Sequence, residues 1–477
     1  MLIITKVNID FLRFVINFSQ DINYVYWKSL LKSQENMKKL KVAFATLGCR
    51  MNQFETSALE ETFVKKGYQL TDFKDTADIY VVNTCTVTND ADRTSRKTLR
   101  QAKRRNPNAV VVATGCYAQV SPEEIAKMEE VDLVIGNSHK TAVYEIVENF
   151  LNEKNQEKIF IDNIFRKNEF ETFHISTFYE GARPILKVQE GCNSFCSFCI
   201  IPFARGKVRS GKTQEVVKQV KILVDRGFKE IVLTGTQLSQ FGWDKGESLY
   251  QLLKEVVKIE GLYRVRLSSM GINELNDDLI DFLTSEEKIA PHFHLSIQSG
   301  DDKVLRDMKR PYTVREYVDK VEKILSKRPE TAIGTDIITG FPTETEEAFS
   351  NTVKTVEDIP FAYIHVFTYS EREGTKAVSF GDKVSPKEKK RRTNILRAIS
   401  QEKSKSFRKR FLGETLEVLI IGEKEGKKIG LTGNYIHIRF ETEKPINSIT
   451  DVVLTDVGDE REENFGEEKK EVFYEDI

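Results

Sequence analysis

The most informative stretch of the chain, Ile185 to Cys199, reads ILKVQEGCNSFCSFC. Its first half is rich in β-forming residues and predicts a buried strand over Ile185–Glu190. Three cysteines, Cys192, Cys196 and Cys199, follow directly with Cys-x3-Cys-x2-Cys spacing. Three thiolates leave one iron of a [4Fe–4S] cluster open to another molecule, as a catalytic cluster requires. Zinc is the alternative, although zinc sites usually close with a fourth Cys or His and no nearby His offers itself.

Beyond this strand, strands and amphipathic helices alternate along the chain. Helical periodicity is clear over Gln214–Arg226, Leu249–Lys258 and Val314–Lys327. Such alternation predicts parallel strands covered by helices, and six units make a partial (βα)6 barrel with its functional groups at the strand ends. The predicted strands are Ile185–Glu190, Ile231–Thr234, Val265–Ser268, Phe293–Ile297, Ile333–Ile338 and Tyr363–Phe367.

An earlier segment, residues 38–150, shows the same alternation and predicts a doubly wound parallel sheet. Helices are expected over Thr56–Lys66 and Ala91–Arg105, on the two faces of the sheet. In such sheets ligands lie at the carboxyl ends of the strands. The predicted strands are Val42–Thr46, Ile79–Asn83, Val110–Thr114 and Leu133–Ile135.

The other three cysteines, Cys49, Cys85 and Cys116, each follow one of these strands. Because parallel strands end at one edge of the sheet, the three thiols are expected to converge on one ligand. A lone cysteine is most often a small buried apolar residue. Three at equivalent strand ends, two of them preceded by glycine, favour a second three-thiolate cluster.

The C-terminal part of the chain changes character twice. A basic helical segment covers about 386–411, and the short strands Thr415–Ile421, Tyr435–Phe440 and Thr450–Leu454 follow it. These strands predict a small β-barrel or sandwich over residues 412–477. The residues from Val457 to Ile477 are acidic and are expected to be frayed or disordered.

Length and composition exclude several classes of protein. The chain has 477 residues, 40% of them hydrophobic, with 72 Lys and Arg against 73 Asp and Glu. This excludes a disordered polymer, a collagen and a disulfide-dense secreted scaffold. With neither a membrane-spanning run nor an export signal, a cytoplasmic protein is expected. Besides the regions 38–150, 184–411 and 412–477, the sequence shows an irregular linker over 151–183. It also shows a distinct N-terminal extension, residues 1–37, and the protein chain either starts at Met37 or includes this extension as a poorly packed segment.

The net charge of −1 conceals two strongly basic segments. One is a stripe with helical spacing in which no acidic residue occurs between positions 93 and 105, and the other is the block 387–410. Basic helix faces are often simply solvated, but two of them favour an RNA partner. The stripe consists of Arg93, Arg96, Lys97, Arg100, Lys103 and Arg104.

The cysteine motif after a first barrel strand resembles that of the radical S-adenosylmethionine superfamily. The resemblance implies that the Cys192/Cys196/Cys199 cluster binds and reductively cleaves S-adenosylmethionine. The superfamily's common Gly-Gly-Glu strand is not plainly present, and Thr234-Gly235-Thr236-Gln237 stands in its place.

Both cysteine triads and the sequence motifs around them resemble the methylthiotransferase family over about residues 38–440. The resemblance implies two [4Fe–4S] clusters, the second of which delivers sulfur, while a second S-adenosylmethionine supplies the methyl group. It also implies a TRAM-like RNA-binding domain at the C-terminus. The matching motifs are Thr46–Gln53, Asn83–Thr88, Gly115–Gln119, Gln189–Cys192, Ile200–Gly206 and Thr339–Glu344.

Within that family, the wording Asn-Thr-Cys-Thr-Val-Thr is most similar to the MtaB type. That type implies methylthiolation at C2 of N6-threonylcarbamoyladenosine beside the tRNA anticodon, at position 37. Isopentenylated adenosine in tRNA and a ribosomal-protein aspartate are the alternative substrates, and a non-catalytic metal-bound RNA-binding protein is a remoter one. An electron donor and a sulfur donor are implied but not identified. The candidate residues for the cofactor pocket, all at barrel strand ends, are Gln237, Ser296, Gln298 and Asp336.

Overall fold

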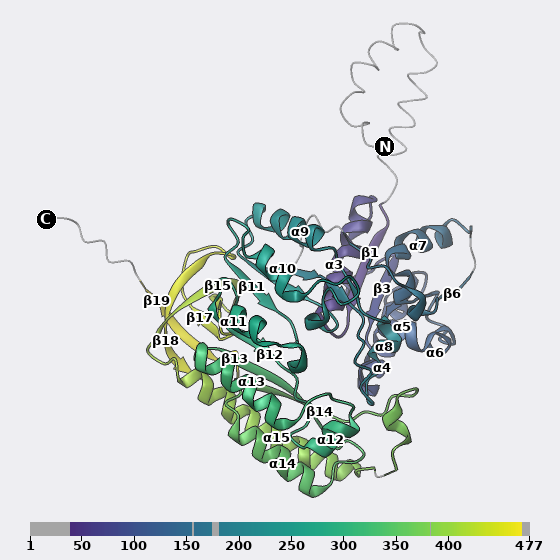
Figure 1. The fold of residues 1–477 in the computed structure, drawn as a ribbon. Coiled ribbons are helices and arrows are strands. Elements are labelled where there is room, and N and C mark those ends of the chain that lie inside the picture. The colour runs from purple at the N-terminus through teal and green to yellow at the C-terminus, as the bar shows by residue number, and fades with distance from the viewer. Residues whose placement is uncertain (1–38, 155–156, 174–180, 382, 470–477) are drawn as a thin grey trace, which may run out of the picture.

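The structure is a computed structural model that describes residues 39–154, 157–173, 181–381 and 383–469. The N-terminal extension, residues 1–37, lies outside the described residues. Three bodies follow one another along the chain: a layered α/β unit, a barrel of strands and helices, and a small β-barrel (Figure 1). The mixed α/β fold class expected from the sequence is confirmed.

The N-terminal sheet has six strands, all parallel, in the order β2-β1-β3-β4-β5-β6. Four of the six were expected from the sequence, and β2 and β6 were not. Each of these two strands has only two residues and lies at a sheet edge, so it carries almost no periodic signal. Residues expected to form only an irregular linker therefore contribute β6 to this sheet. The strands are β1 (Lys41–Thr46), β2 (Gln69–Leu70), β3 (Ile79–Thr84), β4 (Val110–Gly115), β5 (Leu133–Ile135) and β6 (Ile159–Phe160).

Alternate residues of each central strand supply two separate apolar layers. On β3, Tyr80 and Val82 pack in a layer with Leu99 of α4 (Asn89–Arg105). Val81 packs on the opposite face with Phe63 of α3 (Arg50–Lys65). Because side chains alternate across a strand, a sheet covered on both faces reads as a continuous apolar run.

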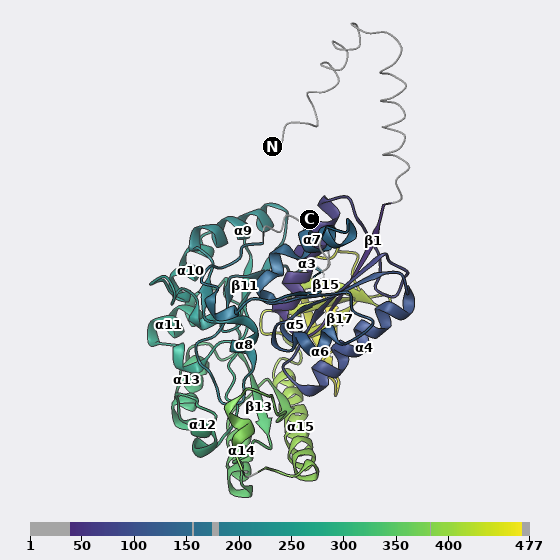
Figure 2. The ribbon, with the colours of Figure 1, turned by 90° about the vertical axis from the view of Figure 1, so that its right-hand side faces the viewer.

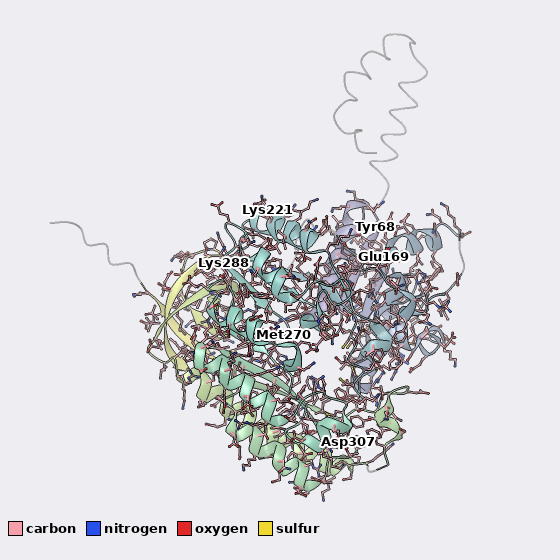
Figure 3. All side chains as sticks on the ribbon, in the orientation of Figure 1. Tyr68, Glu169, Lys221, Met270, Lys288 and Asp307 are labelled. Carbon is pink, nitrogen blue, oxygen red and sulfur yellow. The ribbon has the colours of Figure 1, made fainter. Side chains whose placement is uncertain are left out.

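The central domain places six parallel strands side by side, as two three-stranded sheets. Isolated bridges, one of them between Met270 and Leu295, join the two sheets. Met270 lies near the middle of the molecule in Figure 3. The expected partial barrel is therefore confirmed, and its strands are β7 (Ile185–Lys187), β10 (Glu230–Thr234), β11 (Arg264–Leu267), β12 (His292–His294), β13 (Ala332–Thr339) and β14 (Tyr363–Thr368).

Helices cover the outer face of these strands and form an arc along one side of the molecule (Figure 2). The outward residues of the strands, such as Leu233, Leu267 and Phe293, join the largest apolar core. Several of their neighbours in sequence, including Arg266, His292 and His294, are polar and buried. The principal helices of this domain are α9 (Thr213–Asp225), α10 (Leu249–Val256), α11 (Asp277–Ser285), α13 (Val314–Lys327), α14 (Glu346–Asp358) and α15 (Pro386–Lys409).

Shorter elements connect these units. A two-stranded antiparallel sheet pairs β8 (Gln189–Glu190) with β9 (Arg209–Ser210), and the cysteine loop lies between them in the chain. The short helices are α5 (Cys116–Val120), α6 (Pro122–Ala126), α8 (Ile201–Arg205) and α12 (Asp302–Asp307), and α7 (Val143–Leu151) completes the N-terminal domain. The 3-10 turns are η1 (Asn137–Ala142), η2 (Ile164–Arg166), η3 (Leu238–Gln240), η4 (Ile272–Glu274) and η5 (Lys376–Ser379).

The C-terminal unit is a closed barrel with strand order β15-β16-β17-β19-β18, which confirms the expected small β-barrel. Its core includes Ile438, Val452 and Leu454, together with Ala362 and Tyr363 from the central domain. The two units therefore share apolar contacts. The strands are β15 (Thr415–Lys424), β16 (Lys427–Thr432), β17 (His437–Phe440), β18 (Ile449–Val457) and β19 (Asn464–Glu468).

The expectation that the chain is frayed from Val457 onward is wrong for residues up to 469. Val457 ends β18, and β19 pairs with β18 and with β17. The acidic composition hid β19, in which Glu467 is exposed and Glu468 pairs with Lys444. Asn464 of the same strand is buried and donates to the His437 carbonyl. Among the described residues, no helix is both long and apolar enough to cross a bilayer.

Candidate active site

Two of the N-terminal cysteines follow glycines that no other residue can replace without strain. Gly48 and Gly115 have φ of +93° and +99°. A Cβ on Gly115 would lie 2.5 Å from the Thr84 carbonyl oxygen, and one on Gly48 would lie 2.8 Å from the Cys85 sulfur. The strand ends therefore approach too closely for any side chain.

The structure brings Cys49, Cys85 and Cys116 together at the carboxyl ends of β1, β3 and β4. Cys85 and Cys116 are buried, whereas Cys49 is exposed. Burial raises the pKa of Cys85 to about 12, and nearby Cys116 and Cys49 add to the effect. Burial likewise raises the pKa of Cys116. Thiols kept protonated in this way become thiolates when a metal replaces the protons, and three soft sulfur donors around one space fit an iron–sulfur cluster.

A buried network of charges lies beneath this triad and crosses the boundary between the N-terminal and central domains. Glu55 of α3 accepts from Arg205 of α8 at 2.8 Å and pairs with Lys140 at 3.5 Å. Arg205 also bonds Glu190 at 2.8 Å. Burial alone raises the pKa of Glu55, but the cations Arg205, Lys140 and Lys187 hold it well below its usual value.

This network carries more positive than negative charge. The two carboxylates of Glu55 and Glu190 face four buried cations, which are Lys140, Lys187, Arg205 and Arg209. Burial by itself lowers the pKa of Arg205, but nearby Cys116, Glu55 and Glu190 hold it above its usual value. An excess of buried cations needs an anionic partner, and a cluster held by three thiolates would supply one.

The second triad, Cys192, Cys196 and Cys199, lies on the loop after β8. Gly191 precedes it with φ of +77°, and a Cβ there would lie 1.9 Å from the Lys207 carbonyl oxygen. Burial raises the pKa of Cys199 to about 12, with nearby Cys196 and Cys192 adding to the effect. Arg310 donates to the Cys196 sulfur at 3.3 Å. Such hydrogen bonds to sulfur stabilise an iron–sulfur cluster and tune its potential.

Of the four residues expected in the cofactor pocket, Ser296, Asp336 and Gln298 lie together. The Ser296 hydroxyl donates to the Asp336 carboxylate at 2.7 Å. Gln298 has φ of +73° and donates its backbone N–H to the Asp336 carbonyl at 2.9 Å. Gln237 lies at the end of β10, where its N–H bonds the Gln189 side chain at 3.0 Å.

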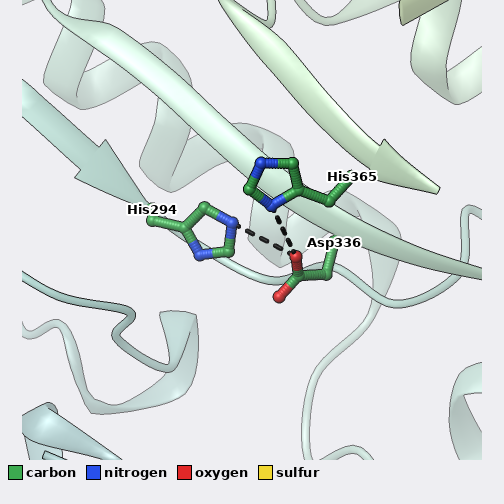
Figure 4. Close-up of side chains that lie close together, drawn as sticks. All are labelled: His294, Asp336 and His365. Atoms are coloured by element: carbon green, nitrogen blue, oxygen red, sulfur yellow. Dashed lines mark hydrogen bonds and ion pairs between the residues drawn. The ribbon is translucent and has the colours of Figure 1, made fainter. Parts of the chain in front are cut away.

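Asp336 also meets two imidazoles (Figure 4). His294 Nε2 and His365 Nδ1 each lie 3.3 Å from the same carboxylate oxygen. Burial by itself raises the pKa of Asp336, but hydrogen bonds from His294, His365 and Ser296 hold it well below its usual value. Asp336 is therefore an ionised carboxylate inside the barrel, linked to strands on both sides.

The six residues of the basic stripe all lie on α4, but four of the six pair with carboxylates of the same domain. Arg96 pairs with Glu124 at 2.8 Å, Arg100 with Glu130 at 3.7 Å and Lys103 with Asp132 at 3.0 Å. Arg93 pairs with Asp90 on the same helix. Lys97 and Arg104 are exposed and have no ion-pair partner among the described residues.

The second basic block lies on α15 and is also largely committed to contacts inside the protein. Arg392 is buried and bonds Glu344 at 2.8 Å, and Arg408 bonds Asn464 at 2.7 Å. Lys403 donates to the backbone carbonyls of Glu357 and Ile359. Much of this charge therefore fixes α15 between the central domain and the small barrel.

Two family models match this chain. One, described as an uncharacterized protein family, UPF0004, covers residues 41–136, and the Radical SAM superfamily covers residues 186–356. The threonylcarbamoyladenosine tRNA methylthiotransferase MtaB of Aquifex aeolicus is 52% identical over 87% of this chain and 100% of its own length. The chain belongs to the MtaB family of radical SAM methylthiotransferases. MtaB of Bacillus subtilis is 40% identical over 87% of this chain and 94% of its own length.

The fold has a counterpart among solved structures. The radical S-adenosylmethionine methyltransferase TsrM from Kitasatospora setae matches with a TM-score of 0.52, covering 69% of this chain and 75% of its own, at 13% identity. Membership of the MtaB family confirms the resemblance noted in the sequence, and the protein is an enzyme that uses S-adenosylmethionine and a [4Fe–4S] cluster.

Several residues at this site were missed from the sequence. The buried charges around Glu55 and the Cys196 partner Arg310 come from distant segments, and no local pattern marks them. Gln240 was also missed, although it bonds Ser194 within the cysteine loop at 3.1 Å and Glu274 at 3.1 Å. The only sequence signal for Gln240 was its position just after a predicted strand.

Proposed function

We propose that this enzyme transfers a methylthio group to C2 of N6-threonylcarbamoyladenosine at position 37 of tRNA. The proposal rests on its 52% identity to the Aquifex relative, whose name states that activity, over that relative's whole length. The arrangement of the triads supports it, because α8, which follows Cys199, packs against α5, which begins at Cys116. A base held at this junction is near both sets of thiols.

We assign Cys192, Cys196 and Cys199 to the cluster that binds S-adenosylmethionine. A second cluster is assigned to the N-terminal domain, held by Cys49, Cys85 and Cys116. When bound, these groups supply the one-electron chemistry and the sulfur that an unactivated aromatic C–H bond requires. The protein holds the ligands in place through the three glycine turns and the buried cations.

The cofactor pocket is assigned to the inward side chains at the strand ends. Asp336 and Ser296 are hydrogen-bonded to each other, and Arg310 donates to both the Ser296 carbonyl, at 3.4 Å, and the Cys196 sulfur. This places them next to the cluster loop, where an ionised carboxylate suits the ammonium or ribose hydroxyls of S-adenosylmethionine. Gln298 and Gln237 are assigned to the same pocket.

The tRNA partner is assigned to the N-terminal helix α4 and to the small C-terminal barrel, which has the TRAM-like form expected from the sequence. On α4, Lys97 and Arg104 are the best candidates for phosphate contacts because they are exposed and unpaired within the described part of the chain. The reaction also requires an electron donor and a sulfur donor, which are further partners of this enzyme.

The metal assignment is tested by iron and acid-labile sulfide content after anaerobic reconstitution. Two clusters are expected in the native chain, and one in each of two variants, Cys116→Ala and Cys196→Ala. With dithionite and S-adenosylmethionine, Cys196→Ala should release no 5′-deoxyadenosine. Cys116→Ala should still release it but form no methylthio product. Zinc without sulfide in the native protein would contradict the assignment.

The substrate is tested by mass analysis of tRNA nucleosides from a deletion strain. We expect 2-methylthio-N6-threonylcarbamoyladenosine to disappear, its unmethylthiolated precursor to remain, and a plasmid copy to restore the product. Loss of methylthiolated isopentenyladenosine, or of the modified ribosomal-protein aspartate, would point instead to the alternative substrates.

A further inference from the structure

An unusual group of arginines surrounds one tyrosine where the three units of the molecule meet. Tyr435 comes from the loop between β16 and β17 of the small barrel. Arg50, the first residue of α3, donates to its hydroxyl at 3.2 Å. The guanidinium carbons of Arg266, Arg461 and Arg183 lie 5.0, 5.5 and 6.0 Å from the centre of its ring.

The carboxylates in this group do not balance the arginines. Glu230 is shared among Arg183, Arg264 and Arg266, with N–O distances of 2.7 to 3.5 Å. Arg264 also pairs with Glu417. Within the described ranges, neither Arg50 nor Arg461 has a carboxylate within ion-pair distance. Five guanidinium groups therefore face two carboxylates.

The titration of neighbouring groups reflects this excess of positive charge. Burial raises the pKa of Tyr435, yet the four arginines Arg50, Arg183, Arg266 and Arg461 bring it below its ordinary value. Burial, and then Arg461, Arg183 and Arg266, lower the pKa of His437 to about 4. An anion is therefore favoured at this place and a further cation is not.

Polar atoms without partners point in the same direction. His292 stacks on Tyr435 with ring centres 4.3 Å apart, and its buried Nδ1 has no hydrogen-bond partner in the described part of the protein. The buried Nδ1 of His437 also has no hydrogen-bond partner among the described residues. Buried polar groups are usually paired, so these atoms are consistent with a polar ligand at this junction.

The arginine group is continuous with the reaction site. Arg50 is adjacent to the triad residue Cys49 in the chain. On the other side, Arg461 lies 4.2 Å from the ring centre of Tyr363, which leads to the imidazole and carboxylate group of Figure 4. A chain of contacts leads from Arg461 to Cys196 of the radical SAM cysteine motif. Its intermediate residues are Tyr363, His365, Asp336, Ser296 and Arg310.

We propose that Arg50, Arg183 and Arg461, gathered around Tyr435, form the subsite for the carboxylate of the substrate's N6 side chain. This inference rests on the proposed function, because the threonylcarbamoyl group carries that carboxylate. C6 of adenine is two bonds from C2 through N1, so a base whose C2 faces the triads would carry its N6 group toward the arginines, of which Arg50 is next to Cys49 in the chain. Guanidinium groups bind carboxylates with paired hydrogen bonds.

The surroundings favour this carboxylate over a backbone phosphate of the tRNA. Arg461 lies over the ring faces of Tyr363 and Tyr435, His292 stacks on Tyr435, and Arg50, Arg183 and Arg461 are all half-buried. Aromatic and planar partners suit a flat carbamoyl and carboxylate group. An uncharged isopentenyl group placed here would leave desolvated cations unpaired, so the subsite would also exclude that substrate.

The variant Arg461→Gln tests the proposal because Arg461 is distant in the chain from every cysteine. Two tRNAs of identical sequence are compared, one with N6-threonylcarbamoyladenosine and one with plain adenosine at position 37. The native enzyme should bind the modified tRNA more tightly, and Arg461→Gln should lose about 10- to 100-fold of that preference. Its affinity for the plain tRNA should be unchanged, and KM should rise more than kcat falls.

Arg461→Lys, which keeps the charge, should recover part of the preference. Arg439→Gln is the matched control, because Arg439 is a half-buried arginine of the same barrel that pairs with Glu425. Iron content, 5′-deoxyadenosine formation and thermal unfolding should be native in all three variants. Equal loss of affinity for both tRNAs in Arg461→Gln would overturn the proposal and indicate a phosphate contact. Failure of the native enzyme to modify the tRNA would overturn the proposed function instead.

Discussion

At the scale of single residues, this site depends on positions where a side chain would not fit. The glycines before Cys49, Cys116 and Cys192 all have positive φ and all lie against neighbouring backbone or cysteine atoms. The sequence showed the Gly-Cys pairs, but it did not show why glycine is required. That reason depends on contacts with a neighbouring strand or loop.

Gly115→Ala should remove the cluster assigned to Cys49, Cys85 and Cys116 and leave the cluster assigned to Cys192, Cys196 and Cys199. The new Cβ would lie 2.5 Å from the Thr84 carbonyl, so β3 and β4 must separate and displace Cys116. Iron content should fall by about half, because only the other three-thiolate cluster would remain, and 5′-deoxyadenosine formation should persist. Gly67→Ala is the matched control, because Gly67 has φ of +98° but no atom within 4 Å of its Cβ position. Native iron content in Gly115→Ala would refute this reading of the turn.

The buried carboxylates make stability depend on pH in a defined direction. Burial raises the pKa of Glu230, but Arg266, Arg183 and Arg264 bring it down to about 2 from an ordinary value of 4.5. A carboxylate with a lowered pKa stabilises the fold fully above the unfolded value, and this contribution is lost as pH falls toward 2. Its size at neutral pH is about 3 kcal/mol.

Glu230→Gln should therefore be less stable than the native chain at pH 7, and the difference should shrink between about pH 4.5 and pH 2. Denaturant unfolding of the two apoproteins, compared at each pH, measures this difference without a contribution from cluster loss. A difference that stays constant over this range would mean that Glu230 is not the group responsible.

At the scale of elements, the alternation of side chains along barrel strands explains both the core and the site. Outward residues such as Leu233 and Phe293 pack under the helices. Inward residues such as Arg266, His294 and Asp336 line the interior. The sequence pattern revealed the outward face clearly, since apolar periodicity is what marks a strand. It gave little information about which inward polar residues meet.

Strand β19 is the element that closes the small barrel. A chain ending at residue 458 should lose β19 and expose the core around Ile438 and Leu454, so tRNA affinity should fall. Iron content and S-adenosylmethionine cleavage should remain, because the cysteine triads lie in the other two units. A chain ending at residue 469 keeps all described strands and serves as the control. Unchanged tRNA binding in the shorter chain would show that the barrel is dispensable for RNA.

At the scale of the whole molecule, the fold neutralises much of the basic stripe that the sequence predicts for RNA binding. The basic stripe is real, but the fold places Glu124, Glu130 and Asp132 against Arg96, Arg100 and Lys103. These acids follow the next strand in the chain, so their approach could be known only from the tertiary structure. Of the stripe residues, Lys97 and Arg104 are exposed and have no ion-pair partner in the part of the chain that the structure describes, so they are the candidates for phosphate contacts.

The double variant Lys97→Glu/Arg104→Glu should weaken tRNA binding about tenfold or more and lower the salt slope of binding by about 1.5, as loss of two phosphate contacts requires. Lys218→Glu/Lys221→Glu on α9 is the matched control, because both lysines are exposed on an outer helix. Filter binding at several salt concentrations gives affinity and slope together. An unaltered slope would exclude α4 from the tRNA interface.

The sequence by itself determined the strand and helix order, the two cysteine triads and the family, because these depend on local periodicity and on short motifs. It also indicated that strand ends would bring each triad together. Only the tertiary structure decided which charges are buried or free, that β19 closes the barrel, and that arginines from four separate segments surround Tyr435. Those features arise from contacts between residues up to hundreds of positions apart, and no local sequence pattern records such contacts.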